Sequence, residues 1–141
     1  MKQFCCTLLF FLATLTSYAQ NFADFFQDKT LRVDYIFTGD ANRQAIYLDE
    51  LSQLPSWAGR QHHLSELPLA GNGQIIVKDV ATGQCIYKTS FSSLFQEWLS
   101  TDEARTTAKG FENTFLLPFP KKTVEVEITL YSPRKDVMAN F

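Results

Sequence analysis

The adjacent histidines His62 and His63 are the only imidazoles in the 141-residue sequence, so any hydrolytic zinc site would depend on them. Such a site needs two or three imidazole or thiolate ligands together with a catalytic acid. Adjacent side chains project in different directions, so one metal ion cannot easily bind both rings. The sequence also lacks a His-Glu-x-x-His motif, which places two ligands on one helical face. We therefore predict no metal site and no cofactor in this chain, and a surface or loop-packing role for the pair.

Nucleophilic catalysis has equally little support in the sequence. A Gly-x-Ser-x-Gly elbow is absent. Cys85 stands in a strand-like run between Gln84 and Ile86, and no motif pairs it with a histidine. A cysteine in this setting is typical of a small core residue. The neighbouring carboxylates at 49–50 and 102–103 give no basis for a glycosidase pair. We predict no catalytic residue and keep an enzyme built on Cys85 only as a remote alternative.

Binding is harder to exclude than catalysis, because the sequence contains two tryptophans. Trp57, Arg60, His62 and His63 lie close together in the sequence and form the candidate binding surface. Stacking on Trp57 would suit a sugar ring, as in other β-sandwich binding modules. The alternative is that Trp57 and Trp98 are core or loop-packing residues, since Trp98 falls on the apolar side of a predicted helix. We favour packing and leave the glycan platform open.

Short stretches of alternating hydrophobicity predict the elements that must position these residues. In residues 30–38, the side chains of Val33, Tyr35 and Phe37 share one face, which is the period of a half-buried strand. Further strands are predicted at 45–51, 74–80, 84–91, 111–117 and 123–131. The serine pair at 92–93 caps a helix of about two turns, whose apolar side carries Leu94, Phe95, Trp98 and Leu99. Several short strands with one short helix predict a mostly β fold, an antiparallel β-sandwich in which 74–80 and 84–91 form a hairpin joined by the glycine-containing turn at 81–83.

Three segments outside the predicted strands and helix also have a predicted conformation or role. Residues 22–28 form a short helical turn or a segment laid across the sandwich. Between Leu54 and Gly73 the periodicity stops, and a connection of that length in a small domain is usually functional or packed by its own side chains. Residues 118–122 are interpreted as the joint between the last two predicted strands.

The end of the sequence carries two further predictions. Glu125, Glu127 and Thr129 alternate with apolar residues and are interpreted as a face of the strand that is exposed to water. Residues 137–141 alternate as though another strand were beginning. We therefore expect a domain truncated at its C-terminal end, with an unpaired final strand or a disordered tail.

Residues 1–19 have the pattern of a secretory signal peptide. Lys2 precedes an apolar run at 4–15, and the triplet at 17–19 has the small-x-small form that signal peptidase accepts. The apolar run is too short to span a bilayer, which needs roughly 20 residues. We expect cleavage to leave one domain, 20–141, that is exported to a secreted, periplasmic or cell-surface location without a membrane span.

Charge and cysteine content limit the partners and the means of stabilisation. The formal net charge is −2, and removal of Lys2 with the leader makes it more negative. This balance disfavours binding to nucleic acid. Cys5 and Cys6 leave with the signal peptide, so Cys85 has no intramolecular disulfide partner. The fold must therefore depend on hydrophobic burial, for which the 13 phenylalanines are the obvious material.

Longer strings of the sequence resemble the N-terminal domain of secreted bacterial M64 (IgA-cleaving) metallopeptidases. The resemblance extends from about Phe22 to Arg134. The strings that carry it are TLRVDYIFTG (30–39), LDELSQLP (48–55), WAGR (57–60), HHLSELPLAGNG (62–73), TSFSSLFQEWL (89–99) and FENTFLLP (111–118).

The resemblance implies an N-terminal β-sandwich domain that precedes a zinc peptidase domain. The zinc ligands of the family belong to the later domain, so zinc is expected only there and no catalytic residue carries over. His62 and His63 match the N-terminal pattern. We expect a non-catalytic accessory domain that supports the catalytic domain or positions substrate, with an M64-type catalytic domain or an extracellular protein as partner. The alternative is a free-standing secreted module that binds glycan or protein.

Overall fold

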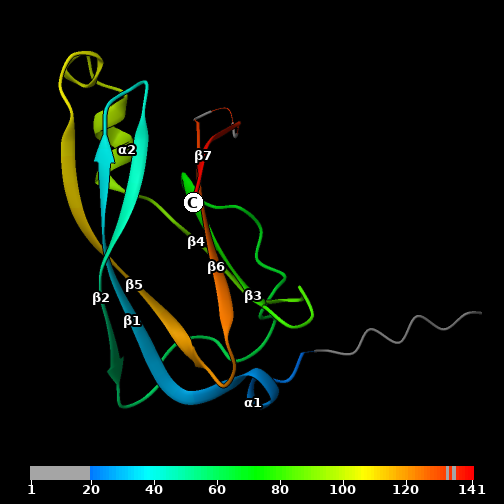
Figure 1. Cartoon of the computed structure of the whole chain (residues 1–141). Helices are drawn as coiled ribbons and strands as arrows, with labels where there is room; N and C mark the ends of the chain where they lie inside the picture. The colour runs from blue at the N-terminus through cyan, green and yellow to red at the C-terminus, as the bar shows by residue number, and fades with distance from the viewer. Residues whose placement is uncertain (1–19, 133, 135) are drawn as a thin grey trace, which may run out of the picture.

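The computed structural model describes residues 20–132, 134 and 136–141, which form two antiparallel β-sheets packed face to face (Figure 1). The predicted signal peptide lies outside these residues. The elements are α1 (Phe22–Phe25), β1 (Phe26–Gly39), β2 (Gln44–Leu54), β3 (Gly73–Asp79), β4 (Cys85–Phe91), α2 (Leu94–Leu99), the 3-10 turn η1 (Glu103–Arg105), β5 (Lys109–Pro120), β6 (Val124–Tyr131) and β7 (Val137–Asn140). Sheet A has the order β2-β1-β5, and sheet B has the order β4-β3-β6-β7. The predicted antiparallel β-sandwich is confirmed. In the described part of the chain, every helix is too short or too polar to cross a membrane.

β1 forms the centre of sheet A and shows the alternation that predicted it. Val33, Tyr35 and Phe37 are buried in the interior, whereas Arg32 and Asp34 lie on the outer face. β-Branched and aromatic side chains fit such a half-buried pleated surface, and this explains why the strand could be read from the sequence. β1 therefore supplies one wall of the core.

β5 runs further than the sequence predicted. The segment 118–122, interpreted as a joint between strands, contributes Pro118 and Pro120 to β5, which pairs with β1 as far as Phe26↔Pro120. Proline has no amide to donate, and it is tolerated here because β5 is an edge strand of sheet A. β1 correspondingly begins at Phe26, directly after α1, so the helical turn expected within 22–28 is present in its first four residues.

The hairpin of β3 and β4 is confirmed, and so is the long connection that precedes it. Gly83 adopts a φ of 70°, the left-handed region that glycine tolerates best, and the Asp79 carboxylate accepts a hydrogen bond from the Thr82 amide at 3.0 Å. β2 ends at Leu54 and β3 begins at Gly73. The connection therefore has to be stabilised by its own side chains.

α2 begins at the predicted cap and buries Phe95 and Leu99 as predicted, but Gln96 lies on its inner face and Leu94 does not. The Ser93 hydroxyl accepts a hydrogen bond from the Gln96 amide at 3.3 Å. The sequence placed Leu94 on the apolar side, yet it is 70% exposed while Gln96 is buried. Gln96 faces inward because its side-chain amide donates to the carbonyl oxygens of Asn72 at 2.5 Å and Tyr131 at 3.0 Å. These bonds satisfy a polar group that would otherwise be costly to bury.

The face of β6 that was predicted to be exposed to water is exposed only in part. Glu125 is exposed, whereas Glu127 pairs with Lys78 of β3 at 2.5 Å. Thr129 is buried, so the prediction is wrong for this residue. It is covered because β7 lies beside β6, where the Thr129 hydroxyl donates to the side-chain oxygen of Asn140 at 3.0 Å. The exposed acidic face is thus confined to the first half of β6.

The strand predicted to begin within 137–141 is β7, and the expectation that it would be unpaired is wrong. β7 runs antiparallel to β6, and the backbones of Phe141 and Ile128 exchange two hydrogen bonds at 2.9 and 3.0 Å. The Phe141 ring packs against Phe37 of β1, with 6.1 Å between ring centroids. β7 therefore closes part of the interior and forms one edge of sheet B.

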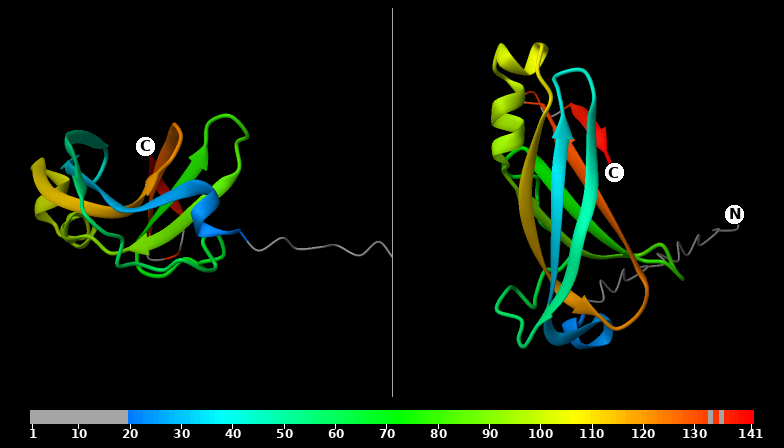
Figure 2. Two further views of the ribbon diagram at one scale, coloured as in Figure 1. Left: turned by 90° about the horizontal axis from the view of Figure 1, so that it is seen from below. Right: turned by 60° about the vertical axis from the view of Figure 1, so that its left-hand side comes forward.

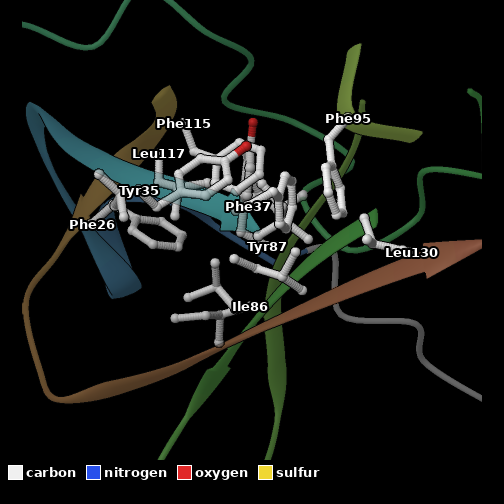
Figure 3. Packing of buried hydrophobic residues seen from close by; sticks show 14 of the residues in the cluster. Phe26, Tyr35, Phe37, Ile86, Tyr87, Phe95, Phe115, Leu117 and Leu130 are labelled. Carbon is white, nitrogen blue, oxygen red and sulfur yellow. The ribbon is translucent and has the colours of Figure 1, made fainter. Parts of the chain in front are cut away.

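Aromatic rings fill the space between the two sheets (Figure 3). Phe37 is fully buried and contacts rings from several elements: Tyr35 at 4.9 Å, Phe95 of α2 at 5.5 Å and Phe91 of β4 at 6.3 Å between centroids. Tyr35 also stacks on Phe115 of β5 at 4.2 Å. Rings of this size bury much apolar surface, which fits a domain whose described cysteine is free.

Candidate functional site

Trp57 is packed into the connection between β2 and β3 and is only 9% exposed. Its ring meets Tyr87 edge-on, with 6.0 Å between centroids, and its indole N–H donates to the Arg60 carbonyl at 3.0 Å. Its backbone amide donates to the Asp28 carboxylate at 3.2 Å. Gly59 lies so close to the indole that a Cβ there would stand 2.2 Å from a ring carbon. The indole therefore has little free face on which a sugar could stack.

Arg60 holds the same connection against the free edge of β4. Its guanidinium lies 4.9 Å from the centroid of the Tyr87 ring. It donates to the carbonyl oxygens of His63 at 2.8 Å and Leu64 at 3.0 Å, and also to that of Lys88 in β4. The Lys88 amide in turn donates to the Leu64 carbonyl at 2.8 Å. Residues 55–72, here called the loop cap, thus satisfy both backbone groups of Lys88 at a sheet edge that would otherwise be open.

His62 and His63 are the exposed members of the predicted binding surface. His63 Nδ1 lies 3.0 Å from Glu66 Oε2, but both side chains are largely in solvent, so the pair contributes little to stability. His63 has a φ of 51°, a left-handed conformation that few residues other than glycine adopt. Of the predicted binding surface, Trp57 is therefore buried and Arg60 is bonded to the backbone of the loop cap, whereas the two imidazoles are exposed.

Cys85 is the first residue of β4 and is half-buried. Its Sγ lies 3.6 Å from the Tyr87 carbonyl, and burial raises the pKa of the thiol. A thiol with a raised pKa is mostly protonated near neutral pH and is a weak nucleophile. The Gln20 side chain donates to the Cys85 carbonyl at 2.7 Å. These contacts suit a packing residue better than a reactive one.

An acidic hollow of about 570 Å³ lies on the outer face of sheet A. It is lined by Arg32, Asp34, Tyr35, Asp49, Glu50, Glu112, Asn113 and Thr114. A hydrogen bond from the Thr114 hydroxyl, together with Arg32 at 2.8 Å, holds the pKa of Asp34 below its ordinary value. The most constrained carboxylate of the hollow is therefore already paired within the fold. Within residues 20–132, 134 and 136–141, no group of three or more His, Cys, Asp or Glu side chains is arranged to hold a metal ion.

A second, apolar depression lies between the sheets on the side away from α2; Figure 2 shows α2 beside β5 and β7 on the opposite side. We call it the open groove. Its volume is about 180 Å³, and it is lined by Val33, Tyr35, Ile46, Leu48, Val126, Ile128 and Phe141. Leu48 of β2 is 61% exposed although it is paired with Tyr35, whose side chain faces the interior. Sheet A therefore overhangs sheet B along β2 and leaves apolar surface in contact with solvent.

The open groove could not be predicted from the sequence. The pattern Val124-Glu125-Val126-Glu127 predicts a strand with one apolar face, but it does not show whether that strand lies inside a sheet or near an edge. Likewise, the exposed side of β2 follows from strand order, which is a property of the folded chain. The clustering of apolar residues in β2 is the sequence feature that could have indicated this exposed apolar surface.

Comparison with known protein families places the chain beside a family of peptidase-associated domains. The family model described as the peptidase M64 N-terminus matches residues 21–141. A search of curated proteins finds no match. The match covers both sheets, the loop cap and the open groove, and it agrees with the resemblance drawn from the strings of the sequence.

Proposed function

The chain belongs to the peptidase M64 N-terminal family, and on this premise we propose that it is a non-catalytic accessory domain of an exported M64-type zinc metallopeptidase. Its role would be to support the catalytic domain or to position protein substrate beside it. The observation that carries the proposal is the family match over residues 21–141.

The placement of the chemistry-bearing side chains supports this proposal. Arg60 is engaged by the backbone of the loop cap and β4, and Cys85 is a half-buried thiol with a raised pKa. His62 and His63 are exposed without a neighbouring set of ligands among the described residues. A packed framework of this kind suits a supporting or recognition role, because catalysis needs groups that are free to act on a substrate.

Two measurements test whether the chain acts as a catalyst. The purified protein is incubated with zinc, dialysed and analysed for bound metal, and it is separately incubated with casein and immunoglobulin A with and without a chelator. We expect no stoichiometric zinc and no cleavage. Chelator-sensitive cleavage by this chain alone would refute the proposal, and a zinc metallopeptidase run in parallel shows that the assay detects cleavage.

A third measurement tests the accessory role itself. An M64-type catalytic domain is assayed on a protein substrate and on a short peptide, with and without the purified chain. If the chain positions protein substrates, it raises kcat/KM on the protein and leaves the rate on the peptide unchanged. Equal rates with and without the chain on both substrates would argue against positioning.

A further inference from the structure

The outer face of sheet A presents large apolar side chains to solvent beside its carboxylates. In the register of the sheet, Tyr47 of β2 stands beside Ile36 of β1, and Ile36 stands beside Glu112 of β5. Tyr47 is 61% exposed, and Leu116, further along β5 on the same face, is 52% exposed. Apolar side chains with this exposure on a sheet face are available for contact with a partner.

The acidic hollow lies on this face, where an extra residue interrupts the regular pairing of β2. The register of β1 and β2 shifts by one residue between Asp34 and Tyr35, which makes Asp49 the extra residue of a β-bulge. Consecutive residues of a regular strand point to opposite faces, whereas here the adjacent Asp49 and Glu50 line the same hollow. Glu112 of β5 lines it from the other side of β1. The bulge therefore concentrates carboxylates on a surface that also carries exposed apolar groups.

The carboxylates of the acidic hollow are only partly neutralised within the fold. Arg32 pairs with Asp34 at 2.8 Å. In the part of the chain that the structure describes, no Lys, Arg or His side chain forms an ion pair with Asp49, Glu50 or Glu112. Glu50 also stands directly opposite Asp34 in the ladder, and like charges in this arrangement are destabilising. A cationic group placed over the hollow would remove this repulsion.

The mixture of charge and apolar surface specifies the kind of side chain that fits this face. Lysine and arginine combine an aliphatic stem, which can lie on Tyr47 and Ile36, with a cationic head that reaches the carboxylates. The Tyr47 ring also attracts a cation. A metal ion would use the carboxylates alone, and among the described residues no three His, Cys, Asp or Glu side chains are arranged to hold one. A second copy presenting the same face would bring carboxylates against carboxylates.

We propose that the outer face of sheet A binds a polypeptide segment rich in lysine or arginine. The cationic heads of the segment pair with Asp49, Glu50 and Glu112, and its aliphatic stems pack on Tyr47 and Ile36. The face consists of β1, β2 and β5, and the final strand β7 takes no part in it. The inference goes beyond the accessory role, because the binding of a basic segment follows from the face itself whether or not the chain assists a peptidase.

Two short blocked peptides test the proposal against the purified protein. One alternates lysine with serine, and its matched control alternates glutamate with serine. We expect saturable binding of the lysine peptide at low salt, with shifts of the amide resonances of Tyr47, Glu50 and Glu112, and loss of binding at high salt. Binding of the glutamate peptide should be weaker by about tenfold or more, because several charge pairs change sign. Absence of binding, equal binding of the two peptides, or unchanged amides in sheet A would overturn the proposal.

Two matched pairs of substitutions locate the binding surface. Glu50→Gln should weaken binding of the lysine peptide by about threefold, whereas Glu97→Gln, the same charge change at an exposed position of α2, should have little effect. Tyr47→Ser should weaken it by about threefold through loss of the ring. Leu48→Ser should have little effect, because Leu48 is equally exposed at 61% but lines the open groove. Equal effects within either pair would overturn the proposal.

Two further measurements distinguish other occupants of this face. Calcium at millimolar concentration is added without peptide while the same amide resonances are followed, and the oligomeric state is measured over a range of protein concentrations. We expect neither saturable calcium binding at the acidic hollow nor dimerisation that shifts these amides. Either result would identify a metal ion or a second copy as the occupant and would overturn the proposal.

Discussion

The two long sides of the sandwich are closed in different ways. On the side of β4 and β5, the loop cap satisfies the backbone of Lys88, and α2 inserts Phe95 against Phe37 at 5.5 Å and Phe111 at 5.7 Å between centroids. On the side of β2 and β7, the described chain supplies only the short strand β7, and Leu48 remains mostly exposed.

This difference separates the residues that hold the domain together from exposed residues that contribute little to its stability. Side chains of the closed side are packed or hydrogen-bonded within the chain, so substitutions there should lower the free energy of unfolding. The exposed side chains of the open side, such as Leu48, make few internal contacts, so substitutions of them should change the free energy of unfolding little. The predictions below test this division in order of decreasing expected effect.

The largest effect is expected for Trp57→Ala in the loop cap. Removal of this buried indole takes away its contact with Tyr87 and its hydrogen bond to the Arg60 carbonyl, and should cost about 3–5 kcal/mol in the free energy of unfolding. Urea denaturation measures the loss. Leu94→Ala is the matched control, because Leu94 is 70% exposed and should cost less than about 0.5 kcal/mol. Similar losses for both would contradict the assignment of Trp57 to the packed side.

A smaller effect is expected for Arg60→Ala, which leaves carbonyl acceptors of the loop cap and β4 without their donor. We expect a loss of about 1–3 kcal/mol and faster exchange of the Lys88 amide as the loop cap loosens. Arg105→Ala serves as the comparison, since the Arg105 side chain is 75% exposed. An unchanged exchange rate at Lys88 would mean that Arg60 does not hold the edge of β4.

Tyr35→Phe should stabilise the domain by about 1 kcal/mol. Tyr35 lines the open groove, and its buried hydroxyl has no hydrogen-bond partner among the described residues. Burial also raises the pKa of this phenol above its ordinary value of 10.0. In the unfolded chain the group ionises near that value, so the native state should lose stability as the pH rises above 10.0, and the substitution should reduce this loss. Denaturation at neutral and alkaline pH measures both effects; destabilisation at neutral pH would indicate a hidden partner.

The smallest effect is expected for Glu103→Gln on the closed side. Hydrogen bonds from Lys109 at 2.7 Å and Trp98 at 3.0 Å lower the pKa of Glu103 below 4.5. A lowered folded pKa contributes stability above the unfolded value, and this contribution is lost as the pH falls through the folded pKa. The variant should therefore be slightly less stable at neutral pH and should converge with the wild type under acidic conditions. A difference that does not depend on pH would contradict this role.

Some elements could be predicted because their signal is local. The alternation of Val33, Tyr35 and Phe37 defined β1, and the glycine turn at Gly83 defined the β3–β4 hairpin. The serine cap of α2 was likewise visible in a few consecutive residues. Each of these depends on side chains close together in the sequence, where strand period and capping chemistry act directly.

Other features depended on distant partners and were predicted wrongly or not at all. Gln96 is buried only because the carbonyl oxygens of Asn72 and Tyr131 accept its two amide hydrogens. Thr129 is covered only because β7 lies beside β6. Trp57 and Arg60 were predicted as part of a candidate binding surface, but contacts with Tyr87 and Lys88 of β4 hold both side chains against the fold.

The sequence by itself determined a mostly β chain, the position of its hairpin, and the strings that resemble the M64 N-terminal family. These follow from the local period of apolar residues and from the order of residue types. Only the tertiary structure decided which strands became edges, which edge the loop cap covers and which apolar residues remain exposed. The physical reason is that a strand pairs through backbone groups common to all residues, so its neighbours are selected by the packing of the whole domain.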